Sequence, residues 1–369
     1  MSTAISKLTP AMAIHPGEIL KDELDARSIS QKNFAQLTGI PQTQLNEIIK
    51  GKRGMYADTA ILIGKALKMD AVLWTNMQMN YELDAAKINE KNRTRLEAIN
   101  IWQMIEDYIP VTYFKKQGII TGNPVNDIPA VKEIYNITNA EQLAIIYSQT
   151  NYACFRKSDK LSIDRVNLIG WVKLVMYNAA QIKVPKFDVR NRKALLEDLK
   201  SIFRKNKNVI QKTKETLAGY GIKLVIQGHP EKCAVDGISF WSNGNPAIGL
   251  TVRHKRIDNF AFTIMHELGH IFLHLVNNNK AEFIDLDKDY GTGDYKNSSE
   301  EKEANEFSRN ALIDKPAWDL FMNENPLFEE AAILSFASKQ KIHPAIAQGR
   351  FFFETDRFNI RSSIDKALE

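Results

Sequence analysis

The stretch Phe260-Ala261-Phe262-Thr263-Ile264-Met265-His266-Glu267-Leu268-Gly269-His270-Ile271-Phe272-Leu273 places two histidines four residues apart in an apolar run with helical periodicity. Positions four apart share one face of an α-helix, roughly 6 Å apart along its axis. His266 and His270 can therefore direct two imidazoles at one zinc ion (Zn2+), and Glu267 can take a proton from water whose pKa the metal lowers. An ordinary buried helix with two hydrogen-bonded histidines is the alternative, and the neighbouring segments favour the metal.

A zinc site of this kind needs a third protein ligand, and a later segment offers three glutamates. Residues 298–307 begin with good N-capping residues and continue with strong helix formers. Glu301 is the favoured ligand, because Asn305 lies four residues later on the same face and can hydrogen-bond a ligating imidazole. Glu303 is the next candidate, and a solvated acidic helix start is the alternative for all three. His274 is too far along the first helix to share the ion, and we interpret it as a structural or rim residue.

Short apolar runs before the histidine helix are typical of strands. They cover residues 224–226, 235–241 and 247–252, with a plausible hairpin connection at 242–246. We expect a small antiparallel sheet beside the metal helix, with an edge strand open to an extended peptide. The sequence does not identify that edge. The acidic, glycine-containing segment 281–299 is expected to be a mobile loop over the cleft.

Residues from about 220 to 350 resemble the ImmA/IrrE family of bacterial metallopeptidases. The matching motifs are Arg256-Ile257-Asp258-Asn259-Phe260 leading into the histidine helix, Glu301-Lys302-Glu303-Ala304-Asn305-Glu306-Phe307, and Ile342-His343-Pro344 with Gly349-Arg350. The resemblance implies zinc bound by His266, His270 and Glu301, with Glu267 as general base. It also implies proteolysis of a regulatory protein, typically a repressor. Residues 310–316 depart from the family's apolar run ending in Met-Pro, so the substrate does not carry over.

The N-terminal region predicts a DNA-binding domain. A helix over 31–38, a tight turn at Gly39-Ile40 and a helix from Pro41 through Lys50 form a helix-turn-helix pattern. The second helix of this motif enters the major groove, and its candidate base-reading residues are Gln42, Thr43, Gln44 and Asn46. Candidate phosphate contacts are Lys50, Lys52 and Arg53. The alternative for these side chains is a solvated polar face. The predicted inward residues are Leu37, Ile40, Leu45, Ile48 and Ile49.

Residues from about 15 to 80 resemble the Xre-type antitoxins of the HigA family. The matching segments are His15-Pro16-Gly17-Glu18-Ile19-Leu20, Gly51-Lys52-Arg53-Gly54 and Ala57-Asp58-Thr59-Ala60, with Ala66-Leu67 and Trp74 also in register. The resemblance implies operator binding as a two-fold homodimer and repression of the protein's own operon. Proline replaces the serine or threonine that usually begins the recognition helix.

The composition is that of an intracellular protein of two or three domains. The 369 residues exceed what one core usually supports, and 49 basic against 44 acidic residues create no global field for polyanions. DNA affinity must therefore come from the local patch at 50–53. Cys154 and Cys233 are too few for a disulfide framework, which favours free thiols in a reducing cytosol. No signal peptide or membrane-length apolar run is apparent, so we expect a cytoplasmic bacterial protein without membrane contact.

These patterns together predict a mainly α fold with a small β-sheet (α+β). We expect a five-helix helix-turn-helix domain at 1–80, a helical connector at 81–160 and a zincin-like peptidase domain at 161–369. The expected function is that of a DNA-binding regulator, antitoxin-like or repressor-like, with a zinc-dependent endopeptidase domain. The alternative is a non-catalytic antitoxin or autorepressor whose peptidase fold is a sensor or toxin-binding module. Expected partners are operator DNA, a protein substrate or cognate toxin, and a second copy of the chain.

Overall fold

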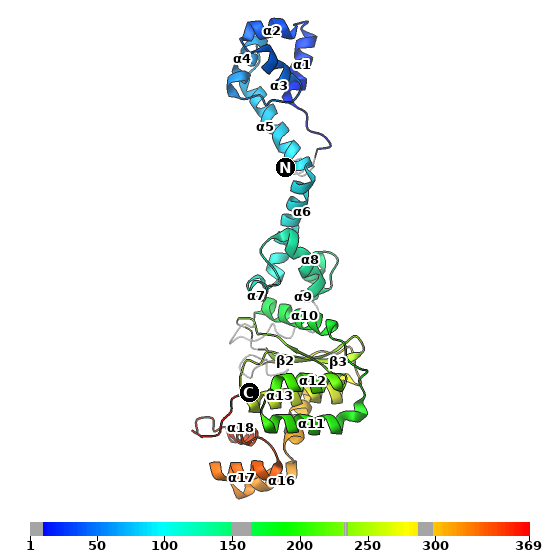
Figure 1. Cartoon of the computed structure of the whole chain (residues 1–369), viewed down its shortest axis with the longest axis vertical. Coiled ribbons are helices and arrows are strands. Elements are labelled where there is room, and N and C mark those ends of the chain that lie inside the picture. Colours follow the sequence, from blue (N-terminus) through cyan, green and yellow to red (C-terminus); the bar gives the residue numbers. More distant parts are fainter. Residues whose placement is uncertain (1–9, 149–163, 232, 234, 287–297) are drawn as a thin grey trace. The chain divides into compact units, whose positions relative to one another are not determined.

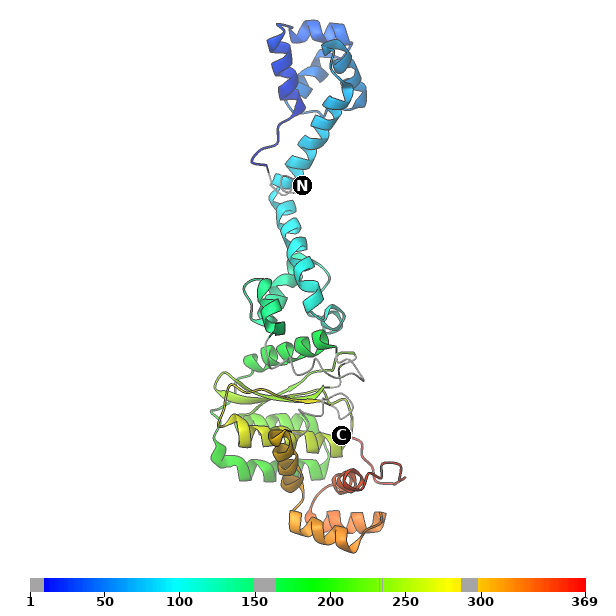
Figure 2. The same cartoon turned by 180° about the vertical axis from the view of Figure 1, so that it is seen from behind.

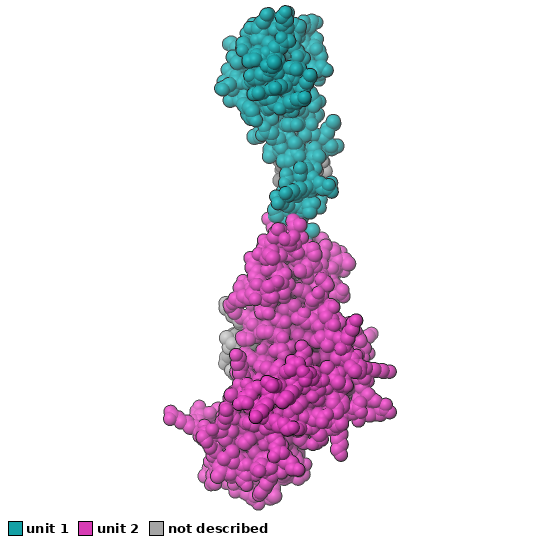
Figure 3. All heavy atoms as spheres, in the orientation of Figure 1, with its two compact units in different colours: residues 1–102 teal, residues 103–369 magenta. Residues whose placement is uncertain are grey.

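The computed structural model describes residues 10–148, 164–231, 233, 235–286 and 298–369. The chain divides into two compact units, residues 1–102 and 103–369, which Figure 3 colours separately. Over the described residues it is mainly helical with one four-stranded mixed sheet, as expected of an α+β protein. None of the described helices is both long and apolar enough to cross a membrane. The predicted boundaries at residues 80 and 160 stay predictions.

The first unit is built from short helices. In chain order they are α1 (Pro16–Ala26), α2 (Gln31–Thr38), α3 (Gln42–Ile49), α4 (Ala57–Leu67), α5 (Ala71–Ile88) and α6 (Glu90–Ile105), of which the last three residues belong to the second unit (Figure 1). A capping box begins α1: the His15 side chain accepts a hydrogen bond from the backbone N–H of Gly17, and Glu18 accepts one from the backbone N–H of His15. Ser30 and Asp70 cap α2 and α5 in the ordinary way through their side-chain oxygens.

The predicted helix-turn-helix is present as α2 and α3. Gly39 ends α2 with a φ of 71°, a left-handed conformation that glycine adopts without a steric penalty. Pro41 precedes α3 as its N-cap and provides no side-chain hydrogen bond, in keeping with the altered cap expected from sequence. At Gly17 the helices α1 and α3 approach so closely that an added Cβ would lie 1.9 Å from the carbonyl oxygen of Ile48.

One predicted core position of this unit is wrong. Ile40, Leu45, Ile48 and Ile49 are buried as expected, but Leu37 is 67% exposed. The buried face of α2 is formed by Phe34, Ala35 and Thr38. Leu37 lies roughly 100° around the helix from the middle of that face, because each residue advances the helix by about 100°.

The sheet of the second unit consists of β1 (Lys223–Ile226), β2 (Val235–Ser242), β3 (Asn245–Leu250) and β4 (Phe283–Leu286), in the spatial order β1-β3-β2-β4. The predicted hairpin joins β2 to β3. Two expectations are wrong. The sheet is not wholly antiparallel, because β1 pairs in parallel with β3 rather than with its neighbour in sequence. Residues 283–286 are not loop but form an edge strand paired with β2. Residues 287–297 of that predicted loop lie outside the described residues, as does Cys154, and its last residue, Ser299, begins the helix α15 (Ser299–Leu312).

Helices cover both faces of this sheet (Figures 1 and 2). On one face lies α10 (Arg165–Gln181), and on the other lie α11 (Arg192–Lys205), α12 (Val209–Gly219) and α13 (Ile257–His270). The indole N–H of Trp171 on α10 donates to the backbone oxygen of Gln227 at 3.1 Å. At Gly249 an added Cβ would lie 2.4 Å from Val175 of α10, so the helix packs directly on the strand.

The unit contains further elements outside the sheet and these four helices. They are η2 (Glu106–Tyr108), α7 (Val111–Lys116), α8 (Pro124–Tyr135), α9 (Glu141–Ser148), η4 (Val189–Asn191), η5 (Ile271–Leu275), α15 (Ser299–Leu312), α16 (Lys315–Glu324), α17 (Glu330–Gln340) and α18 (Pro344–Thr355).

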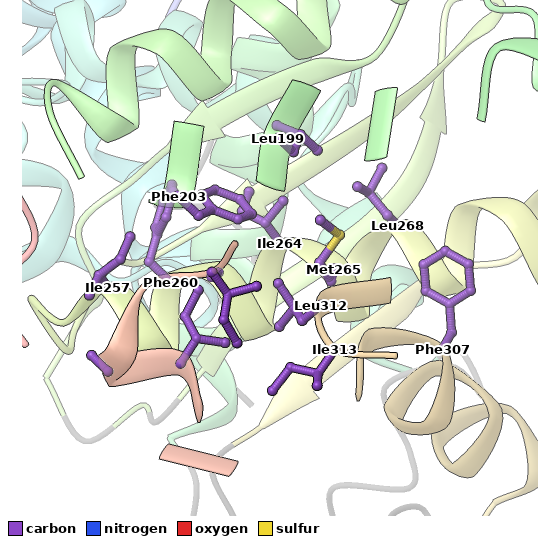
Figure 4. Close-up of a cluster of buried hydrophobic side chains, with 14 of the residues drawn as sticks. Leu199, Phe203, Ile257, Phe260, Ile264, Met265, Leu268, Phe307, Leu312 and Ile313 are labelled. Carbon is purple, nitrogen blue, oxygen red and sulfur yellow. The ribbon is translucent and has the colours of Figure 1, made fainter. Parts of the chain in front are cut away.

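The main hydrophobic core of this unit surrounds α13 (Figure 4). Ile257, Phe260, Ile264 and Leu268 are all buried along α13. Side chains of α11, of α15 and of the residue that follows α15 close the core around them, namely Leu199, Phe203, Phe307, Leu312 and Ile313. The helix that carries the histidine motif is therefore held in place on several sides.

Leu45→Ala and Leu37→Ala form a matched test of the first unit. Leu45 is 0% exposed, and its truncation is expected to destabilise the unit by about 2–5 kcal/mol through loss of burial and the cavity left behind. Leu37→Ala is expected to change stability by no more than about 0.5 kcal/mol, because the side chain is on the surface. Hydrogen exchange of the amides of α1 to α4 in the full chain measures both, and equal losses would contradict the exposed position of Leu37.

Candidate functional site

Two helices position the side chains of the histidine motif and its carboxylate partner. His266 and His270 lie in the last turns of α13, and Glu301 lies in the first turn of α15. The Oγ of Ser298 caps α15 by accepting the backbone N–H of Glu301 at 3.2 Å. The helices cross closely because Gly269 has no side chain there: an added Cβ would lie 3.0 Å from the Cα of Ala304.

The structure brings His266, His270 and Glu301 together in one buried cluster. Their potential ligand atoms all lie within 4.8 Å of one another. The two Nε2 atoms are 3.0 Å apart, and the Glu301 carboxylate oxygens lie 3.4 Å from Nε2 of His266 and 3.3 Å from Nε2 of His270. Glu303, the alternative ligand considered from sequence, does not join the cluster.

Both imidazoles are also held at their other nitrogen. Nδ1 of His266 lies 3.1 Å from Oδ1 of Asn305, which is the contact expected from the spacing of Glu301 and Asn305 on α15. Nδ1 of His270 lies 3.2 Å from Nδ1 of His274, whose Nε2 lies 3.1 Å from Oε2 of Glu303.

The residues present fit a metal ion. Because Nδ1 of His266 must donate to the oxygen of Asn305, its Nε2 presents a lone pair to the cluster unless the ring is charged. The facing Nε2 of His270 and the carboxylate of Glu301 present further electron pairs, and Oε1 of Glu301 makes no hydrogen bond despite being buried. These converging lone pairs repel one another unless a cation lies between them. Two imidazoles and a carboxylate are a zinc ligand set.

Burial and charge perturb the titration of all three groups. Burial opposes ionisation of Glu301, but the two adjacent histidines outweigh it and lower the pKa of Glu301 to about 2. Burial lowers the pKa of His270 to about 4. Burial acts in the same direction on His266, but surrounding carboxylates, led by Asp285, outweigh it and raise its pKa to about 9.

Glu267 lies beneath the sheet rather than among the ligands. It is 0% exposed, and its Oε2 accepts a hydrogen bond from the hydroxyl of Ser239 on β2. Its other oxygen, Oε1, has no hydrogen-bond partner. Burial raises the pKa of Glu267 well above its ordinary value. The carboxyl packs against Gly237 of β2.

The strand β4 completes the surroundings of the cluster. The ring of Phe283 stacks on His270 with centroids 4.5 Å apart. Two residues further on, Asp285 lines a cavity of about 790 Å³ together with His266, Glu301 and Asn305. The sequence pattern did not reveal this contribution, because four residues without alternation carry no strand signal of their own.

The candidate DNA-reading residues of α3 differ in their solvent exposure and in their hydrogen bonds within the protein. Gln42 and Thr43 are exposed, whereas Gln44 and Asn46 are half-buried. The Gln44 amide also lies 3.5 Å from the hydroxyl of Thr59, so part of its hydrogen-bonding capacity faces α4.

The three cations after α3 are all exposed: Lys50, Lys52 and Arg53. Arg53 forms an ion pair with Glu47 at 2.8 Å. Lys50 and Lys52 are therefore the freer phosphate candidates.

Gly237→Ala tests the contact between β2 and Glu267. The new Cβ would lie 2.1 Å from Oε1 of Glu267, and overpacking of this kind costs about 1–3 kcal/mol of stability. The cost is expected to fall when Glu267→Ala removes the opposing oxygen. Urea unfolding of the single and double variants measures this as a double-mutant cycle. Strictly additive losses would show that Glu267 does not pack against Gly237.

Comparisons with known proteins concern the N-terminal part of the chain. No family model matches the chain. Virulence-associated protein I of Dichelobacter nodosus is 37% identical over 81 residues, which are 22% of this chain and 75% of that protein. A HigA-family addiction module antidote protein from Coxiella burnetii is 31% identical, covering 23% of this chain and 95% of its own, with a TM-score of 0.22. Pseudomonas aeruginosa antitoxin HigA, solved with the higBA promoter, is 35% identical, covering 23% and 94%, with a TM-score of 0.22.

The identity to Virulence-associated protein I extends over three quarters of that protein, and it falls on the helix-turn-helix described above. This region is a helix-turn-helix DNA-binding domain of the antitoxin and transcription-regulator type. Through its N-terminal ~80 residues, the chain therefore belongs to the family of Virulence-associated protein I, and these residues resemble the HigA/Xre-type helix-turn-helix antitoxin regulators.

Proposed function

We propose that this chain is an operator-binding regulator that carries a zinc-dependent endopeptidase domain of ImmA/IrrE type within residues 161–369. The observation that carries the peptidase half is the convergence of His266, His270 and Glu301 in one buried cluster beside a cavity. The substrate would be a regulatory protein, which is the class that the resemblance to the ImmA/IrrE family implies.

Zinc, when bound, would supply a Lewis acid that polarises a peptide carbonyl and acidifies water. The proton transfers would be carried out by the chain's own residues. Glu267, adjacent to the first ligand, would hold a proton taken from water and return it to the departing amine. To do so it must first be ionised. A cation held by its neighbours favours that form, because a nearby positive charge lowers the pKa of a carboxyl.

The cavity and the sheet edge suggest how a peptide would lie. β4 is an edge strand of the sheet, and its residue Asp285 lines the cavity together with His266. An extended peptide that paired with such an edge would have its backbone carbonyls aligned by main-chain hydrogen bonds. Because His266 is buried at the cavity wall, a peptide carbonyl that lay beside it would be shielded from bulk water.

The DNA half of the proposal rests on α2 and α3. Gln42 and Thr43 are exposed at the start of α3, which is the part of a recognition helix that meets base edges. The Pseudomonas antitoxin solved with its promoter is 35% identical to this chain over 94% of its own length. We propose the same kind of target here, bound by a homodimer at a two-fold operator.

One observation favours a second candidate, a non-catalytic regulator whose zincin-like domain binds a partner or a signal. Glu267 is fully buried, hydrogen-bonded to Ser239 and not among the residues that line the cavity. A carboxyl in that position stabilises the packing of α13 on β2 without reaching a substrate. A cognate toxin would then be the protein partner.

Glu267→Gln and Glu301→Ala separate these candidates. Glu267→Gln is expected to keep one zinc per chain and to lose proteolysis, because the amide cannot accept a proton. Glu301→Ala is expected to lose zinc, since only two ligands remain. Metal content is measured by atomic emission, and cleavage by mass spectrometry of a proteome-derived peptide pool. Glu306→Ala, an exposed acid on the same helix, is the control.

Undiminished cleavage by Glu267→Gln would reject the base assignment. Stoichiometric zinc with no cleavage of any peptide by the unaltered chain would favour the non-catalytic regulator. A folded, metal-free chain would reject the zinc site altogether.

Gln42→Ala and Lys52→Ala test how the operator is read. Gln42→Ala is expected to weaken binding to the promoter of the chain's own gene by about 1–3 kcal/mol and to affect a scrambled duplex much less. Lys52→Ala is expected to weaken both duplexes alike and to reduce the salt dependence of binding. Fluorescence anisotropy over a range of salt concentrations measures both. A uniform loss for Gln42→Ala would show that this residue does not read bases.

A further inference from the structure

A chain of three side chains extends from the candidate metal cluster to the protein surface. Nδ1 of His270 lies 3.2 Å from Nδ1 of His274, and Nε2 of His274 lies 3.1 Å from Oε2 of Glu303. The His274 side chain is 11% exposed and the Glu303 side chain 59%, so the chain ends in solvent. Neither residue belongs to the ligand set.

The helix changes its winding where His274 lies. After His270, α13 continues as the π-helix η5, which is wider than an α-helix. Single π-turns of this kind are rare and occur frequently at functional sites. Phe283 of β4 packs on both rings, with centroid distances of 4.5 Å to His270 and 5.2 Å to His274. The two imidazoles are thus held side by side by packing as well as by their own contact.

The contacts leave one consistent arrangement of protons. For Nε2 of His270 to present a lone pair to a cation, the proton of that ring must be on Nδ1. Nδ1 of His274 must then accept it, which places the proton of His274 on Nε2. That proton points at the carboxylate of Glu303, which accepts it. Each contact then has one donor and one acceptor.

We propose that His274 and Glu303 are positioning residues, which fix the tautomer and the ring orientation of His270 so that its Nε2 is available to zinc. This inference rests on the proposed zinc site. It assigns His270 a histidine–carboxylate pair as its partner, whereas His266 has the neutral amide of Asn305. A partner hydrogen-bonded behind a ligating imidazole fixes the tautomer and the orientation of that ring.

A simple surface ion pair between His274 and Glu303 is the competing explanation. Such a pair contributes little to stability and would have no bearing on the metal. The two explanations differ in zinc affinity and in the position of the imidazole protons, neither of which depends on turnover.

Zinc affinity of the full-length chain, measured by competition with a chromophoric chelator, is the first test. His274→Phe keeps a ring but offers no acceptor, and we expect it to weaken zinc binding by about tenfold or more. His274→Asn is expected to restore most of the affinity, because its Oδ1 can accept the proton on Nδ1 of His270. Glu303→Ala is expected to weaken binding less than His274→Phe. Glu306→Ala, which removes an exposed acid from the same helix, is expected to have no effect.

The second test needs no variant. Long-range proton–nitrogen NMR of the 15N-histidine-labelled, zinc-loaded chain reports which nitrogen of each ring carries the proton. We expect His270 to be protonated on Nδ1 and His274 on Nε2. A proton on Nδ1 of His274, or zinc binding by His274→Phe as tight as that of the unaltered chain, would overturn the proposal.

These outcomes are distinct from a failure of the proposed function. A chain that binds zinc but cleaves nothing leaves the role of His274 and Glu303 intact. A chain that binds no zinc removes both the site and its positioning residues.

Discussion

The close crossing of α13 and α15 is the packing constraint on which the candidate metal site depends. Gly269 brings its backbone within contact distance of Ala304, and the ligand side chains lie within one turn on either side of that point. A larger residue at the crossing would separate the helices. Ligand geometry tolerates displacements of only about 0.5 Å, so the small residues at the crossing matter as much as the ligands themselves.

The same packing places charge in an interior that would otherwise be apolar. His266, His270, Glu267 and Glu301 are all nearly inaccessible to water, and their pKa values are shifted in different directions. A cluster that served stability alone could be replaced by apolar side chains at little cost. Strongly perturbed titratable groups beside a cavity are instead typical of functional sites. This contrast favours a chemical role for the cluster.

Sequence patterns predicted elements better than the contacts between them. The helix at 31–38 was predicted to the residue, because its cap and its terminal glycine are local signals. Leu37 was misplaced, because a short amphipathic helix leaves the limits of its buried face uncertain. The hairpin of β2 and β3 was found, but the parallel pairing of β1 and the existence of β4 were not. Strand partners are chosen by the whole sheet, and a four-residue edge strand is stabilised mainly by its neighbour.

The order of the amino acids alone establishes the available chemistry: two histidines on one helical face, and a glutamate and an asparagine four residues apart on another. Helical periodicity is a local property, so spacing alone establishes these relations. The folded chain is needed to see which glutamate reaches the histidines, that Glu267 packs under β2, and that His274 contacts His270 and Glu303. Those relations join segments far apart in the chain, and they depend on how closely the helices and the sheet pack.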